Sequence, residues 1–247
     1  MRQGVAQEAQ SAGPVRPPRN QLLDRLPPDE YRRLRPGLEA IPLRQGQLLY
    51  EAGARIHHVY FPSGAVVSLR AAMGTGATVE VATIGREGVL GLAACLADGT
   101  SSTRAVVQVA GGATRLRAAS FREAGRGSPA LLGLLLGYAQ ALTEQAMQLA
   151  ACHRLHPLEQ RAARWLLLLH GRVGPGPFPV THELLAEVLG AGRPAVSVAA
   201  GMLRRAGAIH YHRGMVTVLD RAGLEAAACE CYRVLRSSAE RVPGTPP

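Results

Sequence analysis

The segment from Thr181 to Ala206 has the pattern of two short helices joined by a tight turn, and it constrains the fold more than any other part of the chain. Thr181 is a residue type that caps helix N-termini, and Gly190 and Gly192 bracket the turn that a helix pair crossing at roughly 90–120° requires. Pro194 lacks a backbone N–H, is tolerated only in a first helical turn, and therefore marks the start of the second helix. The pattern predicts a helix-turn-helix.

The hydrophobic periodicity of the same segment divides each helix into an inward and an outward face. The inward positions are Leu185, Leu189, Val196, Ala199 and Leu203. The outward positions of the second helix are Arg193, Ser197, Val198 and Gly201. A plain pair of antiparallel helices is the alternative interpretation, but it has no need of two turn glycines and a proline at the start of its second helix.

The residues after this segment predict a two-stranded sheet and one further helix. Gly207 is typical of the position just after a helix end. Residues 209–211 and 215–219 are rich in β-branched and aromatic types, so we expect two strands around a turn at residues 212–214. Asp220 would cap a last helix that continues through Tyr232. Helix, helix and hairpin together predict a winged helix-turn-helix.

The composition of the chain fits a nucleic-acid partner. All 28 basic residues are arginine and the formal net charge is +10. The absence of a signal peptide, together with only four cysteines (Cys95, Cys152, Cys229 and Cys231), indicates a reducing, cytoplasmic location without a disulfide framework. The most apolar helical stretch, residues 130–142, is too short to span a membrane. The sequence contains no catalytic triad order, P-loop or dinucleotide fingerprint, so we do not expect an enzyme.

The N-terminal half predicts a leader followed by a β-domain. Residues 1–20 are rich in Gly, Pro, Gln and Arg, and we expect them to be disordered. Short helices are expected after Asn20 and at Pro28. From residue 41 to 121, short apolar runs alternate with glycine-containing turns, which predicts a β-barrel or jelly roll. The expected strands are residues 47–50, 59–61, 66–69, 78–84, 105–109 and 114–116.

Pro129 opens a long predicted helix with a heptad repeat. Its seam positions advance by alternating steps of four and three residues: Leu131, Leu135, Tyr138, Leu142, Gln145, Leu149 and Cys152. A heptad seam with one polar residue inside predicts a parallel contact between two copies of the chain. Packing of the helix on its own β-domain is the alternative. Because Leu132, Leu134 and Leu136 widen the apolar face, we expect the helix to do both.

The fold class is therefore α+β, with the elements grouped into consecutive domains. A helix over residues 158–170 and a Gly-Pro linker at residues 174–177 precede the helix-turn-helix. The expected boundaries are a disordered leader (1–20), a β-roll of the double-stranded β-helix type (21–127), a dimerisation helix (128–156), a winged helix-turn-helix (157–232) and a flexible tail (233–247).

In this order of domains, residues 21–232 resemble the Crp/Fnr family of bacterial transcription regulators. The residues that carry the resemblance are Gly46, Gly53 and Gly64 in the roll, Arg161 and Trp165 after the long helix, and the segment 181–203. The resemblance implies a homodimer that reads a two-fold operator in double-stranded DNA, with half-sites about 10 bp apart and RNA polymerase as a further partner. It also implies a cyclic-nucleotide-binding-like roll whose effector rotates the two long helices about their seam.

The roll departs from the cyclic-AMP-binding members of that family. Where those members have a Gly-Glu pair and an Arg-Ser pair, this chain has Gly91-Leu92 and Thr103-Arg104. Leu92 replaces the ribose-binding carboxylate, and an arginine displaced by one residue faces the other side of its strand. The iron–sulfur members carry cysteines near the N-terminus, and this chain has none before Cys95. Neither cyclic AMP nor an iron–sulfur cluster nor haem is expected, and the effector is not identified.

The resemblance also places the DNA contacts. Arg193 matches the first base-reading arginine of the family, and Pro194 and Val198 occupy its other two reader positions. We expect Arg193 to bind a guanine edge, with Ser197 and Val198 beside it. The expected backbone contacts are Thr181, His182, Gly201 and Arg213. The competing hypothesis is a ligand- or redox-sensing roll that regulates a protein partner, with DNA binding secondary.

The remaining candidates for metal or redox chemistry are assigned to packing. Cys152 and His156 are one helical turn apart, but Cys152 completes the apolar seam and His156 precedes a proline. A ligand shared by these two residues, or a pairing of Cys152 with its symmetry mate, stays open as an alternative. Cys229 and Cys231 are two apart in a predicted helix and would point in different directions. No metal site is predicted.

Overall fold

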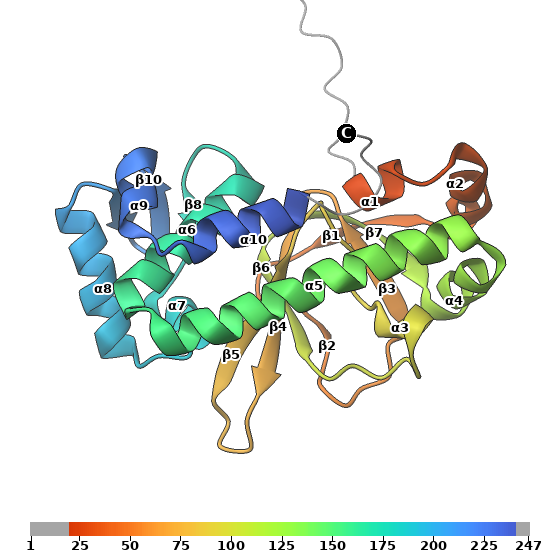
Figure 1. The fold of residues 1–247 in the computed structure, drawn as a ribbon, viewed down its shortest axis with the longest axis horizontal. Helices are drawn as coiled ribbons and strands as arrows, with labels where there is room; N and C mark the ends of the chain where they lie inside the picture. The colour runs from red at the N-terminus through yellow and green to blue at the C-terminus, as the bar shows by residue number, and fades with distance from the viewer. Residues whose placement is uncertain (1–19, 241–247) are drawn as a thin grey trace, which may run out of the picture.

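The computed structural model describes residues 20–240, with side chains to residue 238. The predicted leader up to residue 19 and the end of the predicted tail lie outside these residues. Figure 1 shows a β-rich half and a mainly helical half, with one long helix, α5 (Pro129–Leu155), running diagonally along both. The β-rich half is the predicted roll, and the helical half contains the helix-turn-helix.

The chain enters the roll through two short helices and a 3-10 turn: α1 (Gln21–Asp24), α2 (Pro28–Leu34) and Arg35–Gly37. The side chain of Asn20 accepts hydrogen bonds from the backbone N–H groups of Leu22 and Leu23, which caps α1 as predicted. Its amide donates to the carbonyl oxygens of Pro62 and Gly88, at 2.9 and 2.8 Å. Asn20 is therefore buried against the roll, and its assignment to a disordered leader is wrong.

Seven antiparallel strands form two sheets. They are β1 (Glu39–Leu43), β2 (Leu48–Tyr50), β3 (His58–Pro62), β4 (Val66–Ala72), β5 (Thr78–Ile84), β6 (Arg104–Val109) and β7 (Gly111–Arg117). One sheet has the order β2-β6-β4-β5 and the other β1-β7-β3. All six expected strands are present. The sequence did not predict β1, because Pro42 interrupts its pattern, but a proline is tolerated on such an edge strand.

The roll is closed by two further helices and by the first half of α5. The helices are α3 (Ala93–Leu96) and α4 (Ala118–Gly127). Phe121 of α4 packs edge-to-face on Phe61 of β3, with ring centroids 5.9 Å apart. Tyr138 of α5 lies so close to the backbone of Gly88 that a Cβ atom there would be 2.1 Å from the tyrosine hydroxyl oxygen. Only glycine therefore fits at position 88.

The α5 residues predicted to form a dimer seam face their own chain, so that prediction is wrong. Leu131, Leu135 and Tyr138 belong to the core of the roll, and Leu142 packs against it. The side chain of Gln145 accepts a hydrogen bond from the backbone N–H of Thr83, at 3.0 Å. Leu149 and Cys152 are buried as well. Six of these seven side chains are buried within their own chain and Leu142 is half-buried, so little of the predicted seam is left for a partner helix.

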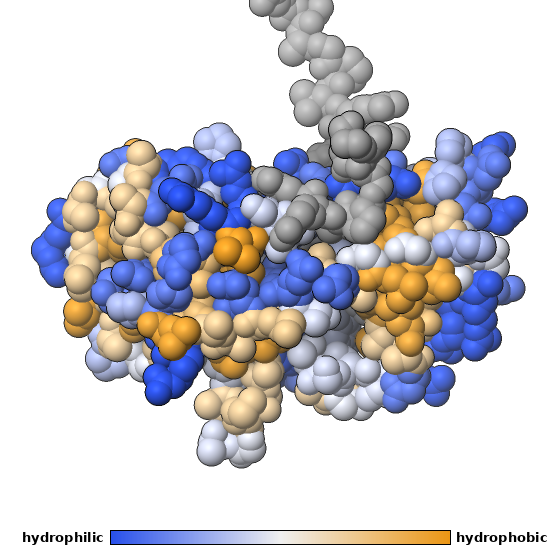
Figure 2. Space-filling model, in the orientation of Figure 1, coloured by the Kyte–Doolittle hydropathy of each residue, from blue (hydrophilic) through white to orange (hydrophobic). Residues whose placement is uncertain are grey.

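The exposed face of α5 includes residues that follow seam residues by one position. One residue corresponds to a rotation of about 100° around the helix axis, so these side chains point away from the roll. Its exposed positions include Leu132 (38% exposed), Leu136 (53%) and Met147 (69%). Figure 2 shows hydrophobic surface over the N-terminal half of this helix. Although α5 contains 27 residues, neither it nor any other helix in the described part of the chain is long and apolar enough to cross a membrane.

The C-terminal half consists of helices around a small sheet. Its elements are α6 (Leu158–Val173), β8 (Phe178–Pro179), α7 (His182–Leu189), α8 (Arg193–Arg205), β9 (Ile209–His212), β10 (Met215–Val218), α9 (Arg221–Ala227) and α10 (Cys231–Glu240). The sheet order is β8-β10-β9. Strand β8 was not predicted, because two residues next to a Gly-Pro linker carry no periodicity.

The single last helix predicted from Asp220 to Tyr232 is instead two helices, α9 and α10. Helix α10 extends through most of the predicted flexible tail and packs against α5 (Figure 1). Leu235 is 1% exposed, and the Ser238 hydroxyl donates to Glu144 of α5 at 3.4 Å. The segment is mostly polar, which is why it was predicted to be flexible, but its apolar residues lie on one face of the helix. Burial of that face against α5 holds the helix in place.

Polar contacts, most of them buried, join the winged domain to the roll. Glu80 of β5 is 3% exposed and accepts a hydrogen bond from the indole N–H of Trp165 on α6, at 3.0 Å. Arg70 of β4 forms an ion pair with Glu187 of α7. Arg172 of α6 lies 2.8 Å from Glu87. These contacts fix the position of the helix-turn-helix relative to the roll.

Candidate DNA-binding face and a cysteine–histidine cluster

The helix-turn-helix has the geometry that its sequence predicts. The hydroxyl of Thr181 accepts a hydrogen bond from the backbone N–H of Leu184 at 3.1 Å, which caps α7. Gly190 ends α7 in the left-handed conformation, with φ 58°. Helix α8 begins at Arg193, with Pro194 in its first turn. All five predicted inward residues are buried, at 3% exposure or less.

Arg193 projects from the first residue of α8 and is not enclosed by the fold. Its side chain is 68% exposed, and its Nε lies 2.9 Å from a carboxylate oxygen of Glu183, which is 56% exposed. A hydrogen bond from its own backbone N–H lowers the pKa of Glu183, and the charge of Arg193 lowers it further. The sequence analysis missed this ion pair, which holds the guanidinium in place in the free protein.

The other residues of α8 that were predicted to contact DNA differ in how exposed they are. Val198 is 62% exposed, whereas Ser197 and Gly201 are only partly exposed. The hydroxyl of Ser197 lies 2.9 Å from Nδ1 of His182 and donates to the carbonyl oxygen of Arg193 at 3.1 Å. Two exposed residues of this face were missed by the sequence analysis. They are Ala195 and Met202.

His182 is part of the support of α8 rather than a free surface group. Its ring stacks on Tyr211 of the wing, which is the hairpin of β9 and β10, with ring centroids 4.6 Å apart. Its Nε2 is buried without a hydrogen-bond partner among the described residues. His182 thus links the start of α7 to α8 and to β9. Together with the use of the Thr181 hydroxyl as a cap, this geometry favours a positioning role for both residues.

Arg213 lies at the tip of the wing. Arg213 and Gly214 both have positive φ, 47° and 76°, between the paired residues His212 and Met215. This conformation is a two-residue type I′ turn, the connection that matches the twist of a short hairpin. The side chain of Arg213 is exposed there, as a backbone contact to DNA would require.

The roll shows where the displaced arginine of the nucleotide-binding region lies. Arg104 forms a double hydrogen bond with Glu51 through Nε and Nη2, and both side chains are partly exposed. Gly91, with φ 88°, and Leu92 precede the short helix α3. The guanidinium of Arg104 is therefore engaged by a carboxylate of its own sheet.

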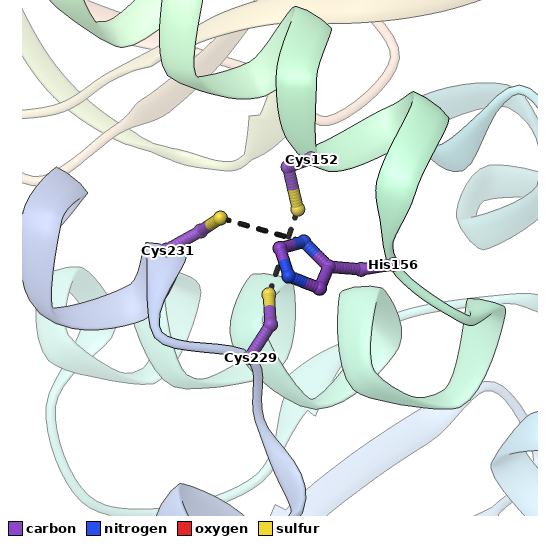
Figure 3. A group of neighbouring side chains, drawn as sticks. All are labelled: Cys152, His156, Cys229 and Cys231. Carbon is purple, nitrogen blue, oxygen red and sulfur yellow. Dashed lines mark hydrogen bonds between the residues drawn. The ribbon is translucent and has the colours of Figure 1, made fainter.

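Three cysteines and a histidine, which the sequence analysis assigned to packing, meet at the end of α5 (Figure 3). Cys152 lies in the last turn of α5, and His156 is the residue after its end. Cys229 and Cys231 come from the joint between α9 and α10. The prediction that they point in different directions is wrong, because residue 229 precedes the helix. A hydrogen bond from the Cys152 thiol lowers the pKa of Cys229 to about 6.

Arg161, one of the residues that carried the family resemblance, connects three helices beside this cluster. Its Nη1 donates to the carbonyl oxygen of Leu189 at 3.0 Å and lies 3.2 Å from Nδ1 of His153. It thereby links the end of α5, the start of α6 and the end of α7. The first helix of the helix-turn-helix is thus fixed to the long helix.

Comparison with known proteins agrees with this architecture. Residues 160–227 match the model of the Crp-like helix-turn-helix domain. Comparison with curated proteins gives no matching sequence.

Solved structures resemble the chain over most of its length. FixK2 from Bradyrhizobium japonicum has 16% sequence identity and a TM-score of 0.66, covering 78% of this chain and 98% of that one. A Crp/Fnr family transcriptional regulator from Thermus thermophilus has 22% identity and a TM-score of 0.64, covering 77% and 98%. A Crp/Fnr family protein from Eubacterium rectale has 16% identity and a TM-score of 0.68, covering 83% and 96%.

The fold and the site together define a protein with a winged helix-turn-helix domain of the Crp-like type. Residues 160–227 are similar to the Crp-like helix-turn-helix domain, and about four fifths of the chain shares the fold of solved Crp/Fnr regulators.

Proposed function

We propose that the protein is a cytoplasmic, homodimeric transcription regulator that reads a pseudo-palindromic operator through α8 and acts on RNA polymerase. The observation that carries the proposal is the exposed Arg193 at the start of a helix whose opposite face is fully packed. An arginine in this position reaches O6 and N7 of a guanine in the major groove. Val198 lies on the same side, where it packs on a thymine methyl group.

The Arg193–Glu183 ion pair supports this role. Both side chains are more than half exposed, so the pair contributes little to the stability of the fold. It restricts the guanidinium near the groove-facing end of α8 without burying it. When Arg193 binds a guanine, the carboxylate of Glu183 is left facing the major groove, where it accepts a hydrogen bond from a cytosine amino group.

Replacement of Arg193 by alanine tests the proposal. We expect Arg193→Ala to lose roughly 1–3 kcal/mol per half-site of preference for the selected operator over random DNA, because one bidentate base contact is removed from each half-site. The measurement is selection of bound sequences from random DNA, followed by titration of the selected operator and of random DNA. If the variant keeps the full preference, Arg193 does not read a base.

Arg205→Ala is the matched control. Arg205 is an exposed arginine in the last turn of the same helix, so the variant removes the same charge. We expect it to weaken operator and random DNA alike and to reduce the salt dependence of binding. Selected sequences without two-fold symmetry would contradict the homodimeric part of the proposal.

The dimer contact that we propose uses the exposed face of α5 instead of the predicted seam. Leu132, Leu136 and Met147 recur along that face and are 38–69% exposed in the part of the chain that the structure describes. Paired helices at this face place the two winged domains on the same side of the dimer, as a two-fold operator requires.

The roll senses an effector other than cyclic AMP in this proposal. The support is the pairing of Arg104 with Glu51 and the leucine at position 92. At these two positions the roll therefore has neither a free arginine for a cyclic phosphate nor a carboxylate for a ribose. Calorimetric titration with cyclic AMP is expected to give no binding signal, and micromolar binding would contradict this part of the proposal.

A further inference from the structure

We propose that Cys152, His156, Cys229 and Cys231 bind one zinc ion in a closed tetrahedral site. Their four ligand atoms all lie within 4.8 Å of one another, and the three cysteines are buried (Figure 3). Three thiolates and one imidazole are a donor set typical of structural zinc. The site is independent of the DNA-reading face and of the roll.

The distances within the cluster fit a single ion. Tetrahedral geometry with Zn–S of about 2.3 Å and Zn–N of about 2.0–2.1 Å requires edges of about 3.8 Å between two sulfurs and about 3.6 Å between sulfur and nitrogen. The sulfurs of Cys152 and Cys229 are 3.5 Å apart, and Cys231 Sγ lies 3.6 Å from Nδ1 of His156. A cluster of two or more irons would distribute these ligands over separate metal ions and hold them further apart.

The groups around the cluster also suit a bound metal. Nε2 of His156 lies 3.1 Å from a carboxylate oxygen of Glu230, while Nδ1 faces Cys231. A metal-bound histidine usually donates its other ring N–H to a carboxylate in this way, which fixes its tautomer and orientation. The amide of Gln148 donates to the sulfur of Cys231 at 3.0 Å, as it would to a thiolate.

Two arginines provide positive charge beside the cluster. Arg164 is 1% exposed, and its Nε is buried without a hydrogen-bond partner, as is Nε of Arg161. Neither residue takes part in the ion pairs found among the described residues. Buried charges need compensation, and the carboxylates beside these two arginines are Glu80, which interacts with Arg164, and Glu159, which interacts with Arg161.

A zinc-loaded site adds negative charge beside these arginines. The three cysteines bind as thiolates and His156 as the neutral imidazole, so the protons that the thiols carry in the free protein are released to solvent. Two positive charges of the metal and three negative charges of the thiolates leave the site with a net charge of −1. This negative charge lies beside Arg161 and Arg164 and compensates part of their positive charge.

The location of the site gives it a structural consequence. Cys152 and His156 come from the end of α5, and Cys229 and Cys231 follow α9. The elements from α6 to α9 therefore lie between the two halves of the site. A metal that joins these halves closes the loop that contains the winged domain and fixes its ends on the long helix.

The test is to measure zinc in the full-length protein. The protein is loaded with Zn²⁺ under reducing conditions and passed over a chelating resin before elemental analysis. We expect about one zinc ion per chain in the original protein and almost none in Cys229→Ser and Cys231→Ser. Cys95→Ser is the matched control, because Cys95 is a partly buried cysteine of the roll and should leave the zinc content unchanged.

A second measurement covers the case in which the cysteine variants do not fold. The original protein loaded with Co²⁺ should show the strong visible absorption of tetrahedral thiolate-bound cobalt, and His156→Gln should change this spectrum. A strong chelator should lower the Tm of the original protein. The proposal is overturned if the folded original protein retains no zinc, if the ligand variants retain it, or if Cys152 and Cys229 form a disulfide instead.

Discussion

Replacement of Glu80 by alanine is expected to lower the free energy of unfolding by about 2–6 kcal/mol, because two buried donors would lose their acceptor at about 1–3 kcal/mol each. The carboxylate of Glu80 accepts from the indole N–H of Trp165 at 3.0 Å and from the amide of Gln108 at 3.2 Å. The indole N–H of Trp165 can only donate, and Gln108 would have to turn its amide to present an acceptor oxygen. The hydroxyls of Ser68 and Thr83 also donate to Glu80, but they can reorient.

The same substitution should loosen the winged domain from the roll, because Trp165 is the contact from α6 to the centre of this network. Burial raises the pKa of Glu80, while its hydrogen bonds and Arg164 oppose that rise. Burial of this carboxyl group is unfavourable, and hydrogen-bond partners from both halves of the molecule offset that cost. Loss of Glu80 leaves those partners without a common acceptor.

Denaturant unfolding with tryptophan emission measures both effects. Trp165 is the only tryptophan of the chain, so its emission reports directly on this contact. Glu51→Ala is the control, since the Glu51–Arg104 ion pair is partly exposed and its loss should change stability by less than about 1 kcal/mol. Equal unfolding midpoints for the two variants would show that the Glu80 network does not join the domains.

The helix-turn-helix could be predicted from sequence because its signals are local. Pro194 and Gly190 each require a particular backbone conformation at a particular position, and the structure has both. The Arg193–Glu183 ion pair is different. It joins two helices whose crossing is known only once they are packed, so the sequence showed the arginine but not its partner.

The sequence did not predict which face of α5 is buried, or the cysteine cluster, for two physical reasons. Helix α5 is apolar nearly all round, with leucines at 131, 132, 134, 135 and 136, so periodicity does not show which side the roll covers. Cys152 and Cys229 are 77 residues apart and come together only through α10, which the sequence analysis took for a flexible tail. Its error about the tail therefore concealed the cluster.

Leu136→Glu is expected to convert the proposed dimer into a monomer and to weaken operator binding by roughly 10²–10⁴-fold, the gain that a second linked half-site provides. Because the contact is two-fold symmetric, the substitution places one carboxylate on each subunit at facing positions of an apolar interface. Burial of an unpaired carboxylate there would raise the free energy of the dimer. Leu136 is 53% exposed within the chain, so the monomer itself should fold normally.

Analytical ultracentrifugation and operator titration measure the two effects, and circular dichroism checks the fold. Met73→Glu is the matched control, because Met73 is also 53% exposed but lies next to the end of β4, away from α5. We expect it to leave mass and affinity unchanged. A Leu136→Glu protein that stays dimeric and binds its operator normally would show that the subunits meet at another surface. The apolar stripe of α5 would then be only the solvent side of a helix whose opposite face completes the roll.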